Sequence, residues 1–386
     1  MLLLLRSLLV ICFAGPARYS PYLSRVCQTA DDNQSLCSEY SVTVDLALGR
    51  RGPPGRVSVG TVKITVLSGG VGGARFLRGL RHHLRESLPD GAGGTTAEIT
   101  AVVNTGDDMW LSSLRITPDL DSIMYTLAGA NDEVRGWGRI GETERVSAEL
   151  NAYGVGWPWF TLGDLDLGTH IARSHFLRSG LALSEATTRI TARWNLGVTL
   201  LPMTDDEVET HVMTDEGSMH FQEWWTRYRA ALPARRFVQQ NLSTANPAPG
   251  VLEAITDSDV ILVAPSNPVV SIGTILGIPG VRGALVEASA PIVGVSPIIS
   301  GSVVRGMADA CLATIGVQTS AEAVALHYGS RSSGGLLDTW LVDESDADAA
   351  AGLAPAGITP LAVPLWMRDL KSSAQLAADA LSAARS

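Results

Sequence analysis

The stretch that decides the fold reads Lys63-Ile-Thr-Val-Leu-Ser-Gly-Gly-Val-Gly-Gly73. Its first half, Lys63–Leu67, has the short apolar run of a buried strand, and its second half, Ser68–Gly73, is a glycine-rich turn. The apolar residues after this turn predict a helix from about Ala74 to Leu88, and a second strand pattern lies at Glu98–Asn104. Strand, helix and strand in this order form a βαβ unit, whose two parallel strands end at the same edge of a sheet.

The same alternation of strands and helices returns in the last third of the chain. From Val251 onward, apolar runs predict strands at 260–264, 291–295, 337–342 and about 358–363, and helices at 303–315 and 371–384. Because strands that alternate with helices form parallel sheets, we expect an α/β fold with a doubly wound, mainly parallel, Rossmann-like sheet. Residues at about 119–195 are largely helical in pattern, and they predict a helical lobe inserted into this domain.

The first 60 residues differ in character from the rest of the chain. Met1–Gly15 is apolar with Arg6 as its single positive charge, like the hydrophobic part of a signal peptide. Residues 16–60 are polar, rich in glycine and proline, and without periodicity. They are either a targeting extension or the result of a start assigned too early. We favour the second, and expect a disordered or mis-assigned leader at 1–60 and one Rossmann-like catalytic domain at 61–386.

Composition and charge restrict the class of function. Hydrophobic residues make up 46% and charged residues 18% of the 386 positions, which is typical of a folded enzyme. The net charge of −10 argues against a nucleic-acid-binding protein, because such proteins present a basic face. A bound phosphate must therefore be met by backbone N–H groups, a metal or a few arginines. The four cysteines form no disulfide or zinc pattern, which favours the reducing cytoplasm.

The glycine-rich turn is a candidate phosphate site. Between a strand and a helix, the N–H groups of a helix start and its dipole attract an anion, and glycine lets the backbone approach it. This predicts ligand contacts for Gly69, Gly70, Gly72 and Gly73. The spacing matches neither a dinucleotide fingerprint nor a Walker loop, so a tight turn without a ligand stays open as an alternative.

A second candidate site comes directly after the second strand, at Asn104-Thr-Gly-Asp-Asp108. Carboxylates next to a phosphate require a divalent cation between them, and Mg²⁺ prefers oxygen ligands, so Asp107 and Asp108 are predicted magnesium ligands. The alternative for Asp107, an acid that binds a ribose, is disfavoured because such an acid normally lies about 20 residues after the glycines. Further aspartates precede helices and are either ligands or N-caps: Asp119, Asp121, Asp164 and Asp166.

Other residues carry weaker signals. Pro265-Ser-Asn-Pro268 comes after a predicted strand, where Ser266 and Asn267 either bind a base or ribose or complete a rigid turn. None of the seven histidines has a metal-binding spacing, and His170 is the one close to an acidic motif. The nine tryptophans favour core packing or a dimer interface, although one of them can stack on a flat ring system.

Several phrases occur together and in order: Ile64–Phe76, Asn104–Asp108, Pro118–Asp121, Gly136–Gly138, Trp159–Asp164, Leu201–Asp206, Ala264–Pro268 and Val295–Ile299. As a set they resemble the 2-phospho-L-lactate transferase family of coenzyme F420 biosynthesis. Phe221–Trp225, His327–Gly329 and Leu337–Val342 resemble its actinobacterial branch, the phosphoenolpyruvate transferases. The resemblance extends from about Lys63 to Met367.

The resemblance implies an enzyme with two substrates. The ribityl hydroxyl of Fo, a deazaflavin, would attack the phosphorus of a GDP-linked lactate or enolpyruvate, and GMP would leave. The product would be coenzyme F420-0 or its dehydro form. It also implies that Gly69–Gly73, Asn104 and Ser266–Asn267 bind the donor, and that Asp107, with Asp108 as the weaker candidate, holds Mg²⁺ on the diphosphate. A cytoplasmic homodimer that binds neither nucleic acid nor a membrane completes this expectation.

Two positions depart from the pattern of the family. Ser112-Ser113 stands where relatives often have His-Gly, and Gly141 stands where many have Asp. Two other functions stay open: a non-catalytic regulatory protein that binds a sugar nucleotide, and an NAD-dependent dehydrogenase. The glycine spacing and the Asp-Asp pair disfavour the dehydrogenase.

Overall fold

The computed structural model describes residues 61–155 and 158–385. The expectations about residues 1–60 fall outside this part of the chain. Val59–Ser386 forms one compact unit, which contains the sheet, the inserted lobe and the candidate site.

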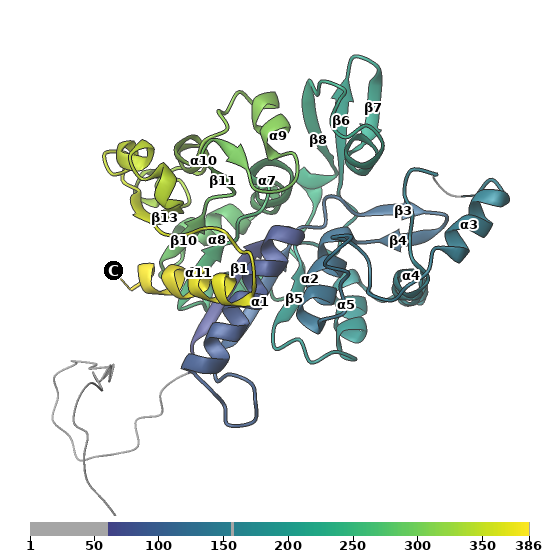
Figure 1. Cartoon of the computed structure of the whole chain (residues 1–386), viewed down its shortest axis with the longest axis horizontal. Helices are drawn as coiled ribbons and strands as arrows, with labels where there is room; N and C mark the ends of the chain where they lie inside the picture. Colours follow the sequence, from purple (N-terminus) through teal and green to yellow (C-terminus); the bar gives the residue numbers. More distant parts are fainter. Residues whose placement is uncertain (1–60, 156–157, 386) are drawn as a thin grey trace, which may run out of the picture. The chain divides into compact units, whose positions relative to one another are not determined.

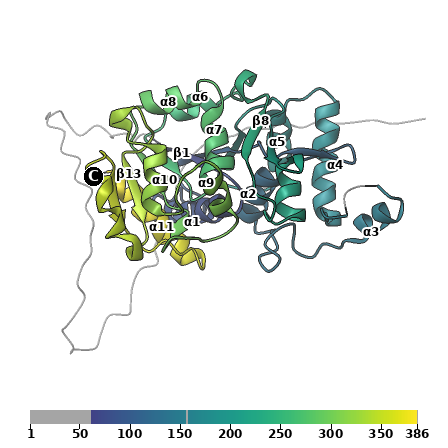
Figure 2. The same ribbon diagram turned by 90° about the horizontal axis from the view of Figure 1, so that it is seen from above.

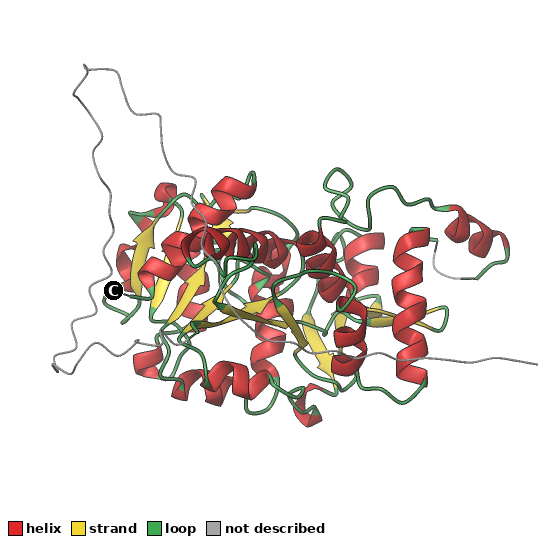
Figure 3. Ribbon diagram, turned by 90° about the horizontal axis from the view of Figure 1, so that it is seen from below, coloured by secondary structure: helices red, strands yellow, loops and turns green. Residues whose placement is uncertain are grey.

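The centre of this unit is a parallel sheet of seven strands, in the order β14-β13-β10-β9-β1-β2-β5 (Figures 1 and 3). All neighbours pair in parallel, as predicted, and this confirms the α/β fold class. The strands are β1 (Lys63–Ser68), β2 (Glu98–Val103), β5 (Thr199–Pro202), β9 (Val260–Val263), β10 (Ile292–Val295), β13 (Thr339–Val342) and β14 (Thr359–Ala362).

Residues of the strands other than the edge strand β14 enter two separate cores, one on each face of the sheet. Ile64 and Val66 of β1 belong to one core, together with buried residues of α1, α2, α5 and α11. Leu67 belongs to the other core, which packs against α6–α10. The sheet is therefore doubly wound. These helices are α1 (Val71–Ser87), α2 (Pro118–Ala128), α5 (Leu183–Thr191), α6 (Val251–Thr256), α7 (Gly273–Gly277), α8 (Val281–Glu287), α9 (Ala308–Thr314), α10 (Ala321–Tyr328) and α11 (Leu370–Ala383).

The chain between β2 and β5 forms most of the inserted lobe. It contains the hairpin β3 (Met109–Leu111) and β4 (Leu114–Ile116), and then α2, α3 (Arg145–Ala152), α4 (Asp164–Arg178) and α5. The hairpin packs on α4 through a small apolar cluster of its own. Figures 1 and 2 both place α3 and α4 at the end of the molecule opposite β13 and α11.

Three features of the fold differ from or add to the sequence-based expectations. Helix α1 begins at Val71, three residues earlier than predicted, so half of the glycine-rich stretch is helical. The helix expected at 303–315 begins only at Ala308, because the chain first forms the short hairpin β11 (Ile298–Ile299) and β12 (Ser302–Val303). An unpredicted antiparallel sheet consists of β6 (Glu209–Thr214), β7 (Gly217–His220) and β8 (Arg236–Gln240).

No single helix in the described part of the chain is long and apolar enough to span a membrane. One bent pair, Pro268–Gly277 with Val281–Glu287, reaches the required length and composition only when both parts are taken together.

Candidate active site

The candidate site lies where the order of strands reverses. From β1 the chain moves to β2 and β5 on one side, whereas β9, β10, β13 and β14 lie on the other side. In open α/β sheets this point leaves a crevice at the carboxyl ends of the strands, and ligands bind there. The glycine turn after β1 and the loop after β9 meet at this crevice, where Gly69 N donates to Ser266 Oγ over 2.9 Å.

The glycines permit close packing. A Cβ on Gly72 would lie 2.3 Å from the carbonyl oxygen of Pro265, and one on Gly70 would lie 2.4 Å from Asp119 Oδ1. Any side chain would therefore separate α1 from the loop after β9 and from α2. No side chain caps the start of α1, so the first N–H groups of this 17-residue helix are available to an anion.

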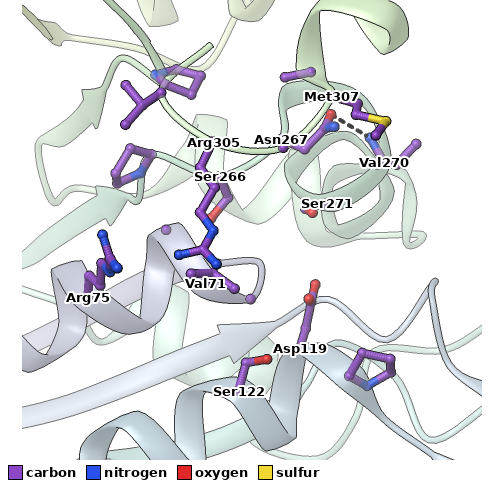
Figure 4. A pocket seen from close by; sticks show the side chains of 18 of the residues that line it. Val71, Arg75, Asp119, Ser122, Ser266, Asn267, Val270, Ser271, Arg305 and Met307 are labelled. Carbon is purple, nitrogen blue, oxygen red and sulfur yellow. Dashed lines mark hydrogen bonds between the residues drawn. The ribbon is translucent and has the colours of Figure 1, made fainter. Parts of the chain in front are cut away.

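A cavity of about 670 Å³ opens at this point (Figure 4). Its volume falls in the range of about 300–1,000 Å³ that is usual for small-molecule sites. The lining comes from the starts of α1 and α2, from the loops after β2, β9, β10 and β12, and from residues 221–225 and 365–368. The polar lining residues include Arg75, Asp107, Asp119, Ser122, Gln222, Ser266, Asn267, Ser271, Ser296, Arg305 and Arg368.

Asp107 and Asp119 bring two carboxylates into this cavity. Asp107 is 5% exposed, and its Oδ1 has no hydrogen-bond partner within the described chain. Asn104 Nδ2 donates to Asp119 Oδ2 over 2.9 Å, while Asn104 Oδ1 accepts from Gly106 N over 3.0 Å. Asn104 therefore holds the loop after β2 against α2.

The electrostatics of this pair favour a positive charge beside it. Burial, and then the charges of Asp119 and Asp108, raise the pKa of Asp107 well above its usual value. Burial raises the pKa of Asp119 to about 6. Two desolvated carboxylates, one with an orphan oxygen, beside the start of a helix fit an oxygen-ligated divalent cation such as Mg²⁺.

Asp108 lies apart from Asp107. It is 1% exposed, does not line the cavity, and faces Arg115, with Asp108 Oδ2 3.7 Å from Arg115 Nη2. Burial raises the pKa of Asp108, against the opposing charges of Arg115 and Arg173. The structure thus places one of the two predicted ligands at the cavity and the other in the interior.

The later aspartates are not helix caps. The N-cap positions of α2 and α4 are Thr117 and Gly163, so the capping alternative is wrong for all four. Asp121 instead forms a buried ion pair with Arg173, whose Nη1 also lies 3.0 Å from His170 Nδ1. Asp166 accepts from Tyr125 Oη over 2.7 Å and lies 3.3 Å from His170 Nε2. The sequence signal for this network was the proximity of His170 to an acidic motif.

This network is a second candidate for metal binding. Asp121, Asp166 and His170 each offer one ligand atom, and these atoms lie within 4.8 Å of one another. Arg173 already supplies a cation to Asp121 and lies 3.0 Å from His170 Nδ1, so a metal would have to bind His170 through Nε2, beside a buried guanidinium. The pair Asp107 and Asp119, which has no such partner in the described chain, fits a metal better.

A second cavity of about 340 Å³ adjoins the first. The two share Pro118, Ser122, Gln222 and Trp225 as lining residues. The second is rich in aromatic side chains: Tyr125, Trp137, Trp159, Phe160 and Trp225. Trp225 belongs to a short π-helix, Glu223–Arg227, a conformation that frequently occurs at functional sites.

Some of the remaining sequence-based candidates line the first cavity, and the others lie outside the two cavities. Ser266 and Asn267 line the first cavity, but the Asn267 side chain accepts from Val269 N and Val270 N and so caps the π-helix Pro268–Ile272. Ser112-Ser113 forms the tip of the β3–β4 hairpin, and neither it nor Gly141 lines either cavity in the described structure.

Comparisons with known proteins bear on the family and the fold of this chain. The family "2-phospho-L-lactate transferase CofD" matches residues 64–356. The phosphoenolpyruvate transferase of Streptomyces coelicolor is 53% identical, over 84% of this chain and 98% of the relative. The phosphoenolpyruvate transferase of Thermobifida fusca is 54% identical, over 83% of this chain and 97% of the relative. A solved UPF0052-family structure from Bacillus halodurans shares the fold, with a TM-score of 0.53 at 16% identity, covering 83% of this chain and 99% of that one. The chain therefore belongs to the 2-phospho-L-lactate transferase CofD family.

Proposed function

We propose that this protein transfers a phosphoenolpyruvyl or 2-phospho-L-lactyl group from a GDP-linked donor to the ribityl hydroxyl of Fo. The observation that carries the proposal is the continuity of two cavities. A polar one holds two carboxylates beside a helix start, and an aromatic one adjoins it through Ser122 and Trp225. Family membership supports the transferase reaction in coenzyme F420 biosynthesis.

The first cavity would hold the donor. The free N–H groups at the start of α1 would bind its diphosphate, and Asp107 and Asp119 would hold Mg²⁺ there. When bound, Mg²⁺ neutralises charge on the diphosphate. Ser266, Ser296 and Met307 would contact the guanosine. Asp107 would also orient the attacking hydroxyl, because its unpartnered Oδ1 is able to accept a hydrogen bond.

The aromatic cavity would hold the acceptor. A deazaflavin ring is flat and apolar on its faces, so Trp137, Trp159 and Trp225 would stack against it. The ribityl chain would then extend past Ser122 toward the carboxylates, because Ser122 lines both cavities.

We propose that residues 61–386 act as one catalytic domain in the cytoplasm and form a homodimer. Large apolar side chains of the inserted lobe are exposed, which is typical of an association surface: Val134, Ile140, Tyr153 and Ile171. A monomeric mass in solution would contradict the dimer.

The experiment that tests the function is a titration with Fo and then a turnover assay. The proposal expects the fluorescence of Fo to change on binding, and mass spectrometry to detect coupled product and GMP when Mg²⁺ and a GDP-linked acid are added. A regulatory protein would bind the nucleotide without turnover, and a protein that leaves Fo fluorescence unchanged would contradict the assignment.

The metal site predicts a pH dependence of stabilisation by Mg²⁺. Because the folded protein raises the pKa of Asp119 from 3.8 to about 6, it binds that proton more tightly than the unfolded chain does. Without a metal, the contribution of Asp119 to the free energy of unfolding therefore falls as the pH rises from about 4 to about 6. Mg²⁺ requires the ionised carboxylate. At Mg²⁺ about 100-fold above its Kd at pH 7, we expect a rise in Tm of roughly 5 °C at pH 7 and about half of that at pH 5, where about a tenth of Asp119 is ionised.

Thermal unfolding in Mg²⁺ and in a chelator measures this difference. In Asp119→Asn the rise in Tm should be small at both pH values. An equal rise at pH 5 and pH 7 in the unsubstituted protein would remove Asp119 from the metal site.

A further inference from the structure

A small recess adjoins both cavities. Its volume is about 30 Å³, which is room for little more than a water-sized group. Val71, Arg75, Ser122 and Arg305 line both the recess and the donor cavity. Ser122, Tyr125, Trp137 and Gly138 line both the recess and the aromatic cavity. The recess therefore lies beside the boundary between the two cavities.

Three arginines line this recess, Arg75, Arg78 and Arg305, and among the described residues one carboxylate lines it with them. Arg78 forms an ion pair with that carboxylate, Glu133. Arg75 and Arg305 have no ion pair or hydrogen bond within the described residues (Figure 4). Burial, and then the charges of Arg305 and Arg78, lower the pKa of Arg75. The recess thus carries an excess of positive charge that the described residues do not neutralise.

The backbone accommodates this arrangement. Arg75 lies one turn into α1, directly after the glycine stretch, and Arg305 comes after the β11–β12 hairpin. A Cβ on Gly136 would lie 2.0 Å from Arg305 Nη2, so this glycine, at φ +82°, leaves the space that the guanidinium occupies. The loop that carries Trp137 in the aromatic cavity therefore also positions Arg305.

We propose that Arg75 and Arg305 bind the carboxylate of the transferred acid and so select a carboxylated donor. This assignment rests on the proposed function. The acid is bonded to the phosphorus that reacts, and that phosphorus lies between the metal carboxylates and the acceptor. Its carboxylate therefore lies at the junction of the cavities. Guanidinium groups match a carboxylate with paired, charge-assisted hydrogen bonds.

The diphosphate of the donor is the other anion available to these arginines. In the proposed function it would be held by the N–H groups at the start of α1 and by the cation that Asp107 and Asp119 would bind. The recess is also too small for a diphosphate, whereas a carboxylate fits it. The two assignments can be distinguished by measurement. Arginines that bind the carboxylate affect only ligands that carry the acid, whereas arginines that bind the diphosphate affect every GDP-linked ligand.

The test compares two ligands by calorimetry, in Mg²⁺ and without Fo. One is GDP-linked lactate, in which the lactyl group is esterified to the β-phosphate, and the other is P²-ethyl-GDP, which lacks the carboxylate. We expect the unsubstituted protein to prefer the acid at least tenfold. Each substitution, Arg75→Gln or Arg305→Gln, should weaken binding of the acid about tenfold, and the double variant about 100-fold. Binding of P²-ethyl-GDP should change by less than about threefold, since its contacts remain.

Arg85→Gln provides the matched control, because Arg85 lies on the same helix but lines neither the recess nor the donor cavity. It should bind both ligands as the unsubstituted protein does. Arg75→Gln should keep or raise the Tm of the ligand-free protein, since it removes a cation that burial and its neighbours disfavour.

Each contrary outcome has its own meaning. If the substitutions weakened binding of both ligands by the same factor, the arginines would be assigned to the diphosphate. If binding of the acid did not change, the recess would not be the site of its carboxylate. Either result overturns this proposal alone. An unsubstituted protein that binds neither ligand would overturn the proposed function and this assignment with it.

Discussion

Substitution of Asp107 by asparagine is expected to lower turnover by a factor of about 10³ while the protein stays folded. Asp107 is the buried carboxylate whose Oδ1 has no partner in the described chain and whose pKa is raised well above normal. Asparagine keeps the shape but removes the charge that would hold the cation at the diphosphate. Loss of one electrostatic contributor of this kind typically costs about 10²–10³ in rate, and loss of a metal ligand acts on the whole site.

The measurement is the initial rate of product formation at saturating Mg²⁺, with the Tm as a check on folding. The Tm without Mg²⁺ should not fall, because the substitution removes a charge that burial disfavours. Near-normal turnover would remove Asp107 from the mechanism.

Asp108→Asn separates the two adjacent carboxylates. Asp108 faces Arg115, which is 3% exposed, so its loss should lower stability, because it leaves a buried cation without its nearest partner. The rate per folded molecule should stay within about tenfold of that of the unsubstituted protein, because Asp108 does not line the cavity. A loss of turnover as large as that of Asp107→Asn would make Asp108 a ligand as well.

The fold and the first half of the site can be predicted from local patterns in the sequence. The strand, glycine turn and helix at Lys63–Ser87 are contiguous, and their apolar spacing is enough to predict a βαβ unit. Asn104–Asp108 comes after the next strand, and parallel strands bring their carboxyl ends together. The position of Asp107 beside the glycines is therefore a consequence of the sheet topology, and the order of strands and helices in the sequence predicts that topology.

The partners of these residues could not be predicted, because the fold brings them from distant segments. Asp119 looks like a helix cap in the sequence, yet Asn104 Nδ2 donates to it across 15 positions, and it lines the same cavity as Asp107. Arg305 falls in a stretch whose apolar spacing favours a helix. Residues at positive φ, Ser300 and Gly306, instead form a hairpin and a turn there. The adjacency of Asp107 and Asp108 suggested one site, but consecutive residues of this loop point to different environments.

Substitution of Arg173 by methionine is expected to lower the free energy of unfolding by about 3–5 kcal/mol, the range for breaking a buried ion pair on one side. Arg173 is 2% exposed and is the cation of the network that holds α4 against α2 and the β3–β4 hairpin. Its nitrogens reach Asp121, His170 Nδ1 and the carbonyl oxygen of Arg115. Methionine fills much of the volume but leaves Asp121 buried without its guanidinium partner.

Urea unfolding monitored by tryptophan fluorescence measures this loss. Arg178→Met, on the same helix but less buried, should cost less than about 1 kcal/mol. The experiment also decides between the two candidate metal sites. Arg173 already provides the positive charge among Asp121, Asp166 and His170. The decrease in the free energy of unfolding of Arg173→Met should therefore be the same with and without Mg²⁺. If Mg²⁺ restored the stability of Arg173→Met alone, the network would be able to bind a metal in place of the arginine. A loss below about 1 kcal/mol would show that Asp121 does not depend on this guanidinium for its place in the interior.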